Sequence, residues 1–465
     1  MGVTVQFLGA ARTVTGSKYL LAGDKGKIFI DFGMFRGEEN LTQKNYDEFD
    51  FNPEEIQYVI LTHAHIDHTG LIPRLVNRGF RGKILCTKPT LDLCGIMFLD
   101  AAHVESIELE WRNRKRERAG KPLLAPVYNI HDAAFCMQFF EALEYNKIKD
   151  LKNGFKVRLN DAGHILGSSI IEIFTKIDKK EKILVFSGDL GNEMQKIVKE
   201  PEILEAADYL FIESTYGDRL HKGRKETLKE FENAIMSANK DKGNIIIPAF
   251  AVERTQEVVY ELSQMYKKSK LDGFSVYVDS PLAIAATEIF QANSKFFDQE
   301  TKKEMAQGHN PFSFPSLVYC KRMEDSRALN NLKSNAIIVS ASGMCEAGRI
   351  KHHLKHNLWR EECVIIFTGY QAIGTTGRAI VEGVKTVKIF GEEIAVRAKI
   401  FTLGGFSGHA DQKGLLKWLS NFKTKKMQVF VVHGEEKGAL AFANVIRERK
   451  HYSVTVPELG QKIKL

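Results

Sequence analysis

The sequence predicts an α/β fold made of two differently organised parts, and three observations lead to this prediction. Residues 1–200 contain short apolar or alternating runs bounded by turn residues, a pattern typical of strands. From about residue 208, strands alternate with long helical stretches, which favours a parallel sheet. After about residue 401 the chain returns to a helix, a strand, a helix and a final strand. The 465-residue chain is long enough for two to four domains.

The elements of the first part follow from these runs. We expect one helix at residues 70–77, ending before Gly79. The spacing does not repeat a regular strand–helix–strand unit, so we expect layers that are largely antiparallel. Strands are predicted at residues 3–8, 19–22, 27–31, 57–62, 156–159, 169–174 and 183–186.

In the second part, predicted strands alternate with predicted helices. Helices are predicted at residues 226–239 and 253–268, with strands at 209–212, 244–248, 275–278, 336–339 and 364–367. Turn segments at 341–343, 369–377 and 404–408 follow strands, which is where open α/β sheets place ligands. The final part is expected to form a helix at 412–421, a strand at 428–432 and a helix at 438–449.

Composition narrows the class of protein. Hydrophobic residues make up 44% and charged residues 27%, which excludes a disordered chain. Lys plus Arg is 66 and Asp plus Glu is 58, a net charge of +8 that is compatible with a polyanionic partner. None of the six cysteines forms a C-x-x-C pair, so we expect no zinc finger and a reducing, cytoplasmic location. No run of about 18 apolar residues predicts a membrane span.

The segment THAHIDHTG at residues 62–70 is the most informative stretch for chemistry. It places His63, His65, Asp67 and His68 within six positions, directly after an apolar strand. Imidazole and carboxylate groups suit zinc. A loop at a strand end lets His63 and His65 aim at one point and Asp67 and His68 at another, so the spacing predicts two neighbouring metal ions.

One such loop cannot complete two metal sites, so further ligands are needed from elsewhere. Three candidates are His164 in AGHILGS, Asp189 in FSGDLG and His433 in VVHGE. Each lies at a strand end beside glycine. Taken singly, such residues more often serve as turn or cap residues; together with the loop they supply what two metal sites lack.

The HAHIDH segment matches the H-x-H-x-D-H signature of the metallo-β-lactamase fold. The whole chain resembles the β-CASP branch of that superfamily, RNA-processing nucleases that include the cleavage and polyadenylation specificity nuclease subunit and short bacterial relatives. The resemblance implies an αββα metallo-β-lactamase sandwich with an inserted α/β β-CASP domain. The expected boundaries are 1–210 and 401–465 for the metallo-β-lactamase domain and 211–400 for the insertion.

The resemblance also implies roles for individual residues. It implies two zinc ions per chain, with a hydroxide bridging them as the nucleophile. Asp31 would orient a ligand, Asp67 would also orient the attacking water, and Glu213 in FIESTYG would hold His409 in FSGHAD, which protonates the leaving oxygen. The implied metal ligands are His63, His65 and His164 for the first zinc, Asp67, His68 and His433 for the second, and Asp189 as the bridge.

The inserted part offers candidates for phosphate contacts. Three glycine-rich or helix-opening turns follow strands, at residues 249–257, 340–349 and 369–378. Backbone amides and guanidinium groups at such turns suit phosphate. The candidate residues are Arg254, Ser340, Arg349 and Arg378.

The resemblance implies zinc-dependent hydrolysis of single-stranded RNA by an endonuclease, and exonuclease activity is left open. The sequence is also compatible with a homodimer. Three alternatives stay open: a small-molecule metallo-hydrolase acting on a thioester or lactam, a nuclease acting on DNA, and a non-catalytic RNA-binding subunit. The insertion of about 190 residues and the pair Glu213 and His409 favour a polynucleotide substrate. The full set of ligands argues against the non-catalytic subunit.

Two segments rich in basic or histidine residues are interpreted as solvated helices rather than as functional sites. Residues 112–121 (RNRKRERAGK) read as a solvated helix with i,i+4 ion pairs, with a surface that guides RNA as the alternative. His352, His353 and His356 read as part of a solvated helix, since no acidic or cysteine partner accompanies them.

Overall fold

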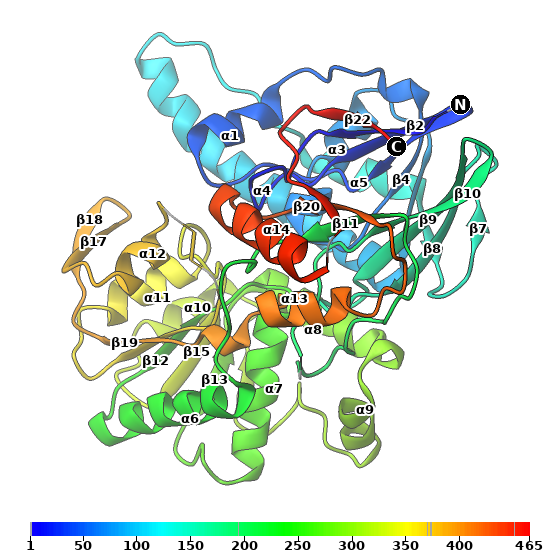
Figure 1. The fold of residues 1–465 in the computed structure, drawn as a ribbon. Helices are drawn as coiled ribbons and strands as arrows, with labels where there is room; N and C mark the ends of the chain where they lie inside the picture. The colour runs from blue at the N-terminus through cyan, green and yellow to red at the C-terminus, as the bar shows by residue number, and fades with distance from the viewer. Residues whose placement is uncertain (1, 194, 370, 373, 451) are drawn as a thin grey trace. The chain divides into compact units, whose positions relative to one another are not determined.

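A computed structural model describes residues 2–193, 195–369, 371–372, 374–450 and 452–465. The chain forms two compact units (Figure 1). The first unit comprises Met1–Glu193, Glu200–Leu220 and His409–Leu465, and the second comprises Met194–Lys199 and His221–Gly408. The second unit is therefore inserted into the first, as the sequence predicts.

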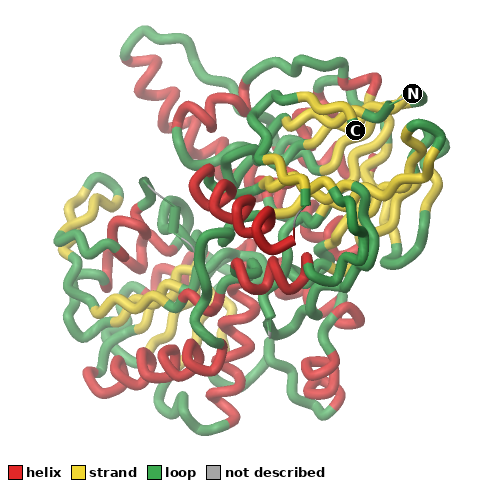
Figure 2. Tube along the Cα trace, in the orientation of Figure 1, coloured by secondary structure: helices red, strands yellow, loops and turns green. Residues whose placement is uncertain are grey.

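Two sheets build the first unit, and both are drawn in yellow in Figure 2. The first sheet has the order β22-β1-β2-β3-β4-β5-β6: Lys462–Lys464, Thr4–Phe7, Tyr19–Gly23, Gly26–Ile30, Ile56–Ile60, Lys83–Thr87 and Phe140–Leu143. The second has the order β21-β20-β11-β10-β9-β8-β7: Ser453–Thr455, Gln428–Val432, Tyr209–Glu213, Lys180–Phe186, Ser169–Ile177, Lys156–Asp161 and Lys149–Asp150.

The two sheets share one apolar core. Strands β1, β3 and β4 supply Phe7, Ile30 and Ile60, which lie in the same buried cluster as residues of the second sheet. In that second sheet Phe211 stacks on Phe186 with ring centroids 4.1 Å apart and on Phe430 at 4.7 Å. Burial of this much apolar surface holds the sheets face to face and fixes where their strand ends lie.

Helices cover both outer faces, which completes the predicted αββα arrangement. Trp418 and Phe442, from α13 and α14, pack on the outer face of the second sheet. Helix α4 contacts β5 and β6 of the first sheet. The helices of this unit are α1 Glu39–Gln43, α2 Ile66–Thr69, α3 Ile72–Asn77, α4 Lys88–Arg118, α5 Ile130–Phe135, α13 Gln412–Leu419 and α14 Glu436–Lys450, with 3₁₀ turns at Lys44–Tyr46, Pro53–Glu55 and Cys136–Phe139.

The second unit is built on a parallel sheet. Its order is β14-β13-β15-β12-β16-β19: Leu317–Tyr319, Ser275–Val278, Ala336–Ser340, Ile245–Pro248, Val364–Phe367 and Lys399–Thr402. All neighbouring strands in this sheet run parallel. A separate hairpin joins β17 Thr386–Ile389 and β18 Glu392–Ala395.

Both faces of this parallel sheet are buried, as a parallel sheet requires. Alternate residues of β12 point to opposite sides: Ile245 and Ile247 pack with α6 and α7, while Ile246 packs with α10, α11 and α12. The helices are α6 Arg224–Asp241, α7 Arg254–Lys267, α8 Pro281–Ala292, α9 Gln299–Ala306, α10 Met323–Leu329, α11 Ile350–Asn357 and α12 Thr376–Val381, with 3₁₀ turns at Ser294–Phe296 and Gly404–Phe406.

The unit boundaries differ from those expected at residues 211 and 400. Strand β11 pairs with β10 and β20, so the first unit keeps the chain as far as Leu220. Strand β19 pairs with β16, so the second unit continues to Gly408. Each expected boundary falls inside a strand, because a change of composition marks a new domain less sharply than strand pairing does.

Several elements lie outside the sequence prediction. Strands β5 and β6 were not expected, and β3 to β6 run parallel, so the first sheet is mixed rather than largely antiparallel. None of the described helices is long and apolar enough to cross a membrane. All six cysteines are buried and free, in agreement with the absence of paired cysteine motifs.

Asp279 organises the second unit from the end of strand β13. It is fully buried and lies 2.6 Å from Nε2 of His353, while it accepts hydrogen bonds from Ser326 (2.7 Å) and Arg349 (2.7 Å). Burial alone would raise the pKa of Asp279, but these three partners outweigh it and lower the pKa. His353 is thus a buried partner of a carboxylate, which corrects the interpretation of His352–His356 as a wholly solvated helix face.

We predict that Asp279→Ala destabilises the second unit by about 3–5 kcal/mol, because the substitution leaves the partly buried Arg349 without its counter-charge and buried His353 and Ser326 without their hydrogen-bond partner. Because the pKa of Asp279 is lowered, its contribution is complete above the ordinary aspartate pKa of about 4 and is lost as the pH falls through the lowered pKa. Calorimetric unfolding at pH 3–8 measures the change. Asp272→Ala removes an exposed carboxylate of the same unit, so it is the control and should shift stability by less than about 0.5 kcal/mol.

Candidate metal centre

Polar side chains gather where neighbouring parallel strands of the two sheets end. Asp31 follows β3 and Thr62–His63 follow β4, while Asp189 follows β10 and His433 follows β20. In the first sheet, β3 and β4 run parallel; in the second, β11 lies between β10 and β20 and runs parallel to both. The carboxyl ends of these strands therefore lie at one edge of each sheet. The sandwich therefore places residues from distant parts of the sequence at a single site.

The backbone at this edge is tightly constrained. Gly188 has a φ of +54°, and a Cβ there would lie 2.8 Å from the Thr62 side chain. Glycine before Asp189 therefore lets the β10 turn approach the end of β4. Asp31 and His433 also have positive φ values, 56° and 46°, at the turns that follow their strands.

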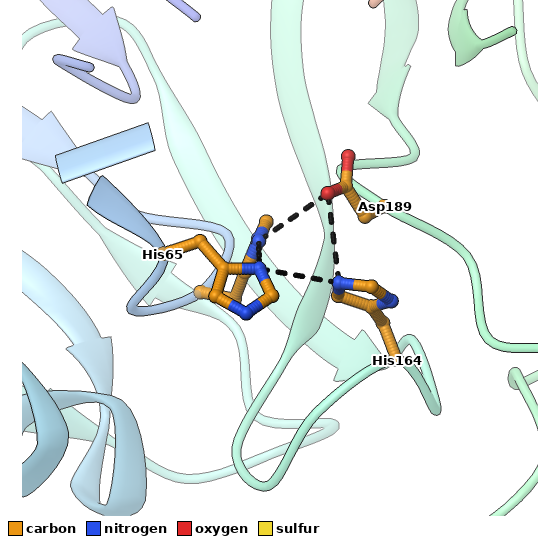
Figure 3. Close-up of side chains that lie close together, drawn as sticks. His65, His164 and Asp189 are labelled. Carbon is orange, nitrogen blue, oxygen red and sulfur yellow. Dashed lines mark hydrogen bonds and ion pairs between the residues drawn. The ribbon is translucent and has the colours of Figure 1, made fainter. Parts of the chain in front are cut away.

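A first set of donors consists of His63, His65, His164 and Asp189, and three of them are labelled in Figure 3. Nε2 of His63 lies 3.0 Å from Nδ1 of His65 and 3.4 Å from Oδ2 of Asp189. Nε2 of His164 lies 3.3 Å from Nδ1 of His65 and 3.6 Å from Oδ2 of Asp189. The four donor atoms thus surround one point.

A second set consists of Asp67, His68 and His433. Nε2 of His68 lies 3.1 Å from Nε2 of His433, and Oδ2 of Asp67 lies 3.4 Å from the same His433 atom. Oδ1 of Asp189 approaches His68 Nε2 at 3.4 Å. The two oxygens of Asp189 therefore face different donor sets.

These distances fit a metal ion. Four ligands at 2.0–2.1 Å around a tetrahedral zinc are about 3.3 Å apart, close to the 3.0–3.6 Å separations of the first set. Oδ1 of Asp189 is buried and accepts no hydrogen bond from the described residues, so this oxygen lacks the partner that a buried carboxylate oxygen normally has. Both observations support binding of a divalent cation between these side chains.

Electrostatics also favour cation binding. Burial lowers the pKa of His63 to about 3 and that of His65 to about 4, so both imidazoles are neutral at pH 7 and have a free lone pair. Burial alone would raise the pKa of Asp189, but the charges of His433 and His68 outweigh it and hold that pKa well below its usual range. The first donor set therefore offers a carboxylate together with neutral imidazoles.

Asp31 and Thr62 fix the orientation of the ligands. Oδ2 of Asp31 lies 2.7 Å from Nδ1 of His68, which turns Nε2 toward the second donor set. The Thr62 hydroxyl lies 2.9 Å from Asp31 Oδ2, 3.0 Å from Nδ1 of His63 and 3.3 Å from Nδ1 of His68. Sequence reasoning missed Thr62, although it opens the THAHIDH segment at the end of a buried strand.

His409 and Glu213 form a pair at the border of the donor sets. Nδ1 of His409 lies 3.1 Å from Oε2 of Glu213, and Glu213 is fully buried, with Oε1 accepting from the Leu190 amide at 2.6 Å. His409 also lies 3.9 Å from Asp189. Burial alone would lower the pKa of His409, but Glu213 and Asp189 outweigh it and raise the pKa to about 9.

Comparisons with known proteins identify the family of this chain. The Metallo-beta-lactamase superfamily matches residues 12–105, the Beta-Casp domain residues 255–380, and the Zn-dependent metallo-hydrolase RNA specificity domain residues 393–457. Ribonuclease TTHA0252 of Thermus thermophilus is 35% identical over 455 residues, 98% of each chain. The chain belongs to the β-CASP ribonuclease family of the metallo-β-lactamase superfamily.

Other relatives extend this similarity. Transcription termination factor FttA of Methanocaldococcus jannaschii is 30% identical and aligns with 98% of this chain and 70% of its own length. FttA of Pyrococcus abyssi is 28% identical over 100% of this chain and 71% of its own. A crystal structure of a protein of unknown function from Enterococcus faecalis V583 shares the fold, with a TM-score of 0.56 at 14% identity and full coverage of both chains.

The four candidate phosphate contacts of the β-CASP unit differ in their exposure. Arg254 is buried and pairs with Glu257. Ser340 is buried and donates to the Asp279 carbonyl at 2.7 Å. Direct phosphate contact by Arg254 or Ser340 is therefore not favoured, because each side chain is buried and already bonds to a neighbouring group.

Arg349 and Arg378 are less buried but also have partners. The Arg349 side chain is 21% exposed and donates to Asp279 and to the Cys320 carbonyl. Arg378 is more exposed and pairs with Glu382 at 2.7 Å, so it remains a prediction for phosphate contact. Residues 370 and 373 of the segment that contains Arg378 lie outside the described residues.

We predict that zinc-loaded protein holds about two zinc ions per chain and that Asp189→Ala holds fewer than one, because both donor sets lose an oxygen. Metal analysis after gel filtration measures the content. His131→Ala removes an exposed histidine of the same unit and should leave it unchanged. Equal zinc in Asp189→Ala and the parent protein would contradict the shared role of Asp189.

Thr62→Val should weaken zinc binding about 10–100-fold while preserving the side-chain volume, because His63 and His68 lose the hydroxyl that orients them. Competition with a chelator of known affinity measures this change. Thr424→Val, at a part-buried hydroxyl that bonds the Ala207 amide, serves as the control. An unchanged zinc affinity in Thr62→Val would show that Asp31 alone orients His68.

Proposed function

We propose that this protein is a metal-dependent ribonuclease that hydrolyses phosphodiester bonds of single-stranded RNA with two zinc ions per chain. The observation that carries the proposal is the convergence of two donor sets on the two oxygens of Asp189, with the His409–Glu213 pair at their border. This arrangement combines a cation site with a proton donor, which a phosphodiester requires because it carries a negative charge and has a poor leaving group.

The family supports RNA as the substrate. One relative that covers nearly the whole chain is named a ribonuclease, and the model matching residues 393–457 describes an RNA specificity domain. Several further relatives are named transcription termination factors. Both kinds of name concern proteins that act on RNA or its synthesis, and neither points to a thioester or a lactam.

The chain's own residues divide the work of hydrolysis. When bound, zinc ions supply positive charge that neutralises phosphate oxygens and favours ionisation of water. Asp67 belongs to the second donor set and its side chain is 28% exposed, so its carboxylate can also accept a hydrogen bond from the attacking water. Glu213 accepts from Nδ1 of His409 and so orients the ring, and Nε2 on the opposite side of the ring would hand a proton to the leaving oxygen.

A panel of substrates tests the proposal. Zinc-loaded protein is incubated with end-labelled linear RNA, circular RNA, single-stranded DNA and a thioester, with Asp189→Ala and chelator as negative controls. Cleavage of circular RNA shows endonuclease action, while shortening of linear RNA from one end shows exonuclease action. Hydrolysis of the thioester without cleavage of RNA would reject the proposal, and cleavage of DNA alone would move it to the DNA-directed alternative.

Two finer expectations belong to this proposal and have separate tests. A homodimer is tested by light scattering of the purified protein. A cytoplasmic location is tested by fractionation of the source cells. Neither result alters the assignment of the metal centre.

We predict that His409→Ala retains its zinc but loses about 10²–10⁴-fold in kcat, because the leaving oxygen loses its proton donor. Glu213→Gln should also lower kcat, since its amide holds the ring of His409 less firmly. Single-turnover cleavage measures kcat, and metal analysis of the same samples is the control. Full activity of His409→Ala with normal zinc content would remove His409 from the mechanism.

A further inference from the structure

Helix α4 (Lys88–Arg118) connects the metal centre to a distant surface of the same unit. It is 31 residues long, or about 46 Å at 1.5 Å per residue. Its first turn is fixed to the loop that carries His164, since the hydroxyls of Thr87 and Thr90 donate to the Gly167 carbonyl at 2.7 and 2.8 Å. In Figure 1 the opposite end, drawn in cyan, extends away from the sheets of this unit.

One side of the outer half of α4 is covered by the chain that follows it. Asn113 exchanges two hydrogen bonds of 2.9 Å with the backbone of Leu124, and Arg116 donates to the Pro122 carbonyl at 2.6 Å. Leu109 is buried, whereas nearly all other buried residues of α4 lie in its first half. The returning chain therefore leaves the opposite side of the helix open.

That open side carries an unusual set of side chains, the α4 outer face. Its members are spaced i, i+4, i+7, i+8 and i+11 and so share one side of the helix. Trp111 is 61% exposed, and Nζ of Lys115 lies 3.5 Å from the centroid of its indole ring. The α4 outer face consists of Ile107, Trp111, Arg114, Lys115 and Arg118.

The outer end of this face is mainly positive, whereas Glu108 and Glu110 lie beside its inner end. Residues 111–121 contain six Lys and Arg side chains and a single carboxylate, Glu117. Arg114 pairs with Glu110, but Arg118 has no carboxylate partner in the part of the chain that the structure describes. Two copies of this face brought together by a twofold axis would set like charges against each other, which disfavours a dimer through this surface.

We propose that the α4 outer face binds single-stranded RNA as a second contact for the substrate of the metal centre. An exposed indole offers a stacking surface for a base, and the flanking cations neutralise phosphates on either side of it. Ile107 and Trp111 are too small an apolar patch for a stable protein interface, whereas one ring among cations suits a single strand. This proposal rests on the proposed function, because it concerns the same substrate.

The position of Trp111 determines which substrates gain from this contact. It lies 23 residues beyond Lys88, about 35 Å along the helix from the His164 loop. A tetranucleotide, about 14 Å at 3.4 Å per nucleotide of stacked strand, cannot occupy the metal centre and reach Trp111. A 24-nucleotide strand spans both, and simultaneous contact raises its effective affinity.

The experiment compares kcat/KM of zinc-loaded protein on a tetranucleotide and on an unstructured 24-mer at several salt concentrations. Trp111→Ala should reduce the preference for the 24-mer about fivefold or more, the effect of losing one stacked base. The double variant Lys115→Ala, Arg118→Ala should lower the log–log salt dependence for the 24-mer by about 1.4, or about 0.7 per cation.

Matched controls exist on the same chain. Trp359→Ala removes a 52% exposed tryptophan of the second unit, and the double variant Lys425→Ala, Lys426→Ala removes two exposed lysines of the first unit. Neither should change the length preference or the salt dependence. The proposal is overturned if Trp111→Ala stays within twofold of the parent or matches Trp359→Ala, or if it changes the mass measured by light scattering, which would identify a second copy as the occupant.

A binding measurement distinguishes failure of the proposed ribonuclease function from failure of the proposed RNA surface. If the parent protein cleaves no RNA, fluorescence anisotropy of a labelled 24-mer still tests the α4 outer face directly. Binding that weakens in Trp111→Ala but not in Trp359→Ala supports the RNA surface independently of cleavage. Binding that is equal in the parent protein and both variants overturns it.

Discussion

The structure depends on a carboxylate buried among imidazoles. Asp189 is 2% exposed, and its two oxygens face four histidines from three segments of the chain. Burying a charge without compensation costs several kcal/mol, so the surrounding groups must be held in place by something other than their own attraction. The aromatic and aliphatic core between the two sheets provides that support, because it fixes the strands whose ends carry these residues.

The two units use their sheets in different ways. In the first unit, the sandwich brings strand ends of both sheets to one edge, and the donors come from the segments that follow these strands. His63, His164, Asp189 and His433 lie one to three residues beyond a strand, while His65, Asp67 and His68 lie further along the segment after β4. In the second unit, the parallel sheet is covered on both faces, and the groups at its strand ends bind one another. Asp279, Arg349 and His353 form such a closed set, so polar residues at a strand end can serve the architecture as well as a ligand.

Sequence patterns pointed to residues that the structure gathers into the two donor sets, because these residues lie in recognisable surroundings. A run of His and Asp after a buried strand, as at His63–His68, leaves few other uses for those residues. Thr62 escaped notice because a threonine at a strand end is common, and only its three contacts reveal its role. Arg254 and Ser340 were expected to contact phosphate but are buried. A glycine-rich turn in the sequence does not indicate whether its polar side chains point toward solvent or into the protein. Strands β5 and β6 were missed because the chain between them is occupied by the long, largely solvated α4.

The order in which the site is assembled has a consequence for synthesis on the ribosome. His68 and His433, whose Nε2 atoms lie 3.1 Å apart, are separated by 365 positions, with the whole second unit translated between them. The nascent chain therefore presents two of the three members of the second donor set long before the third exists. A chain that ends before residue 409 lacks both His409 and His433, so it lacks the proposed proton donor and one member of the second donor set. The proposed centre can therefore be completed only after nearly the whole chain has been translated.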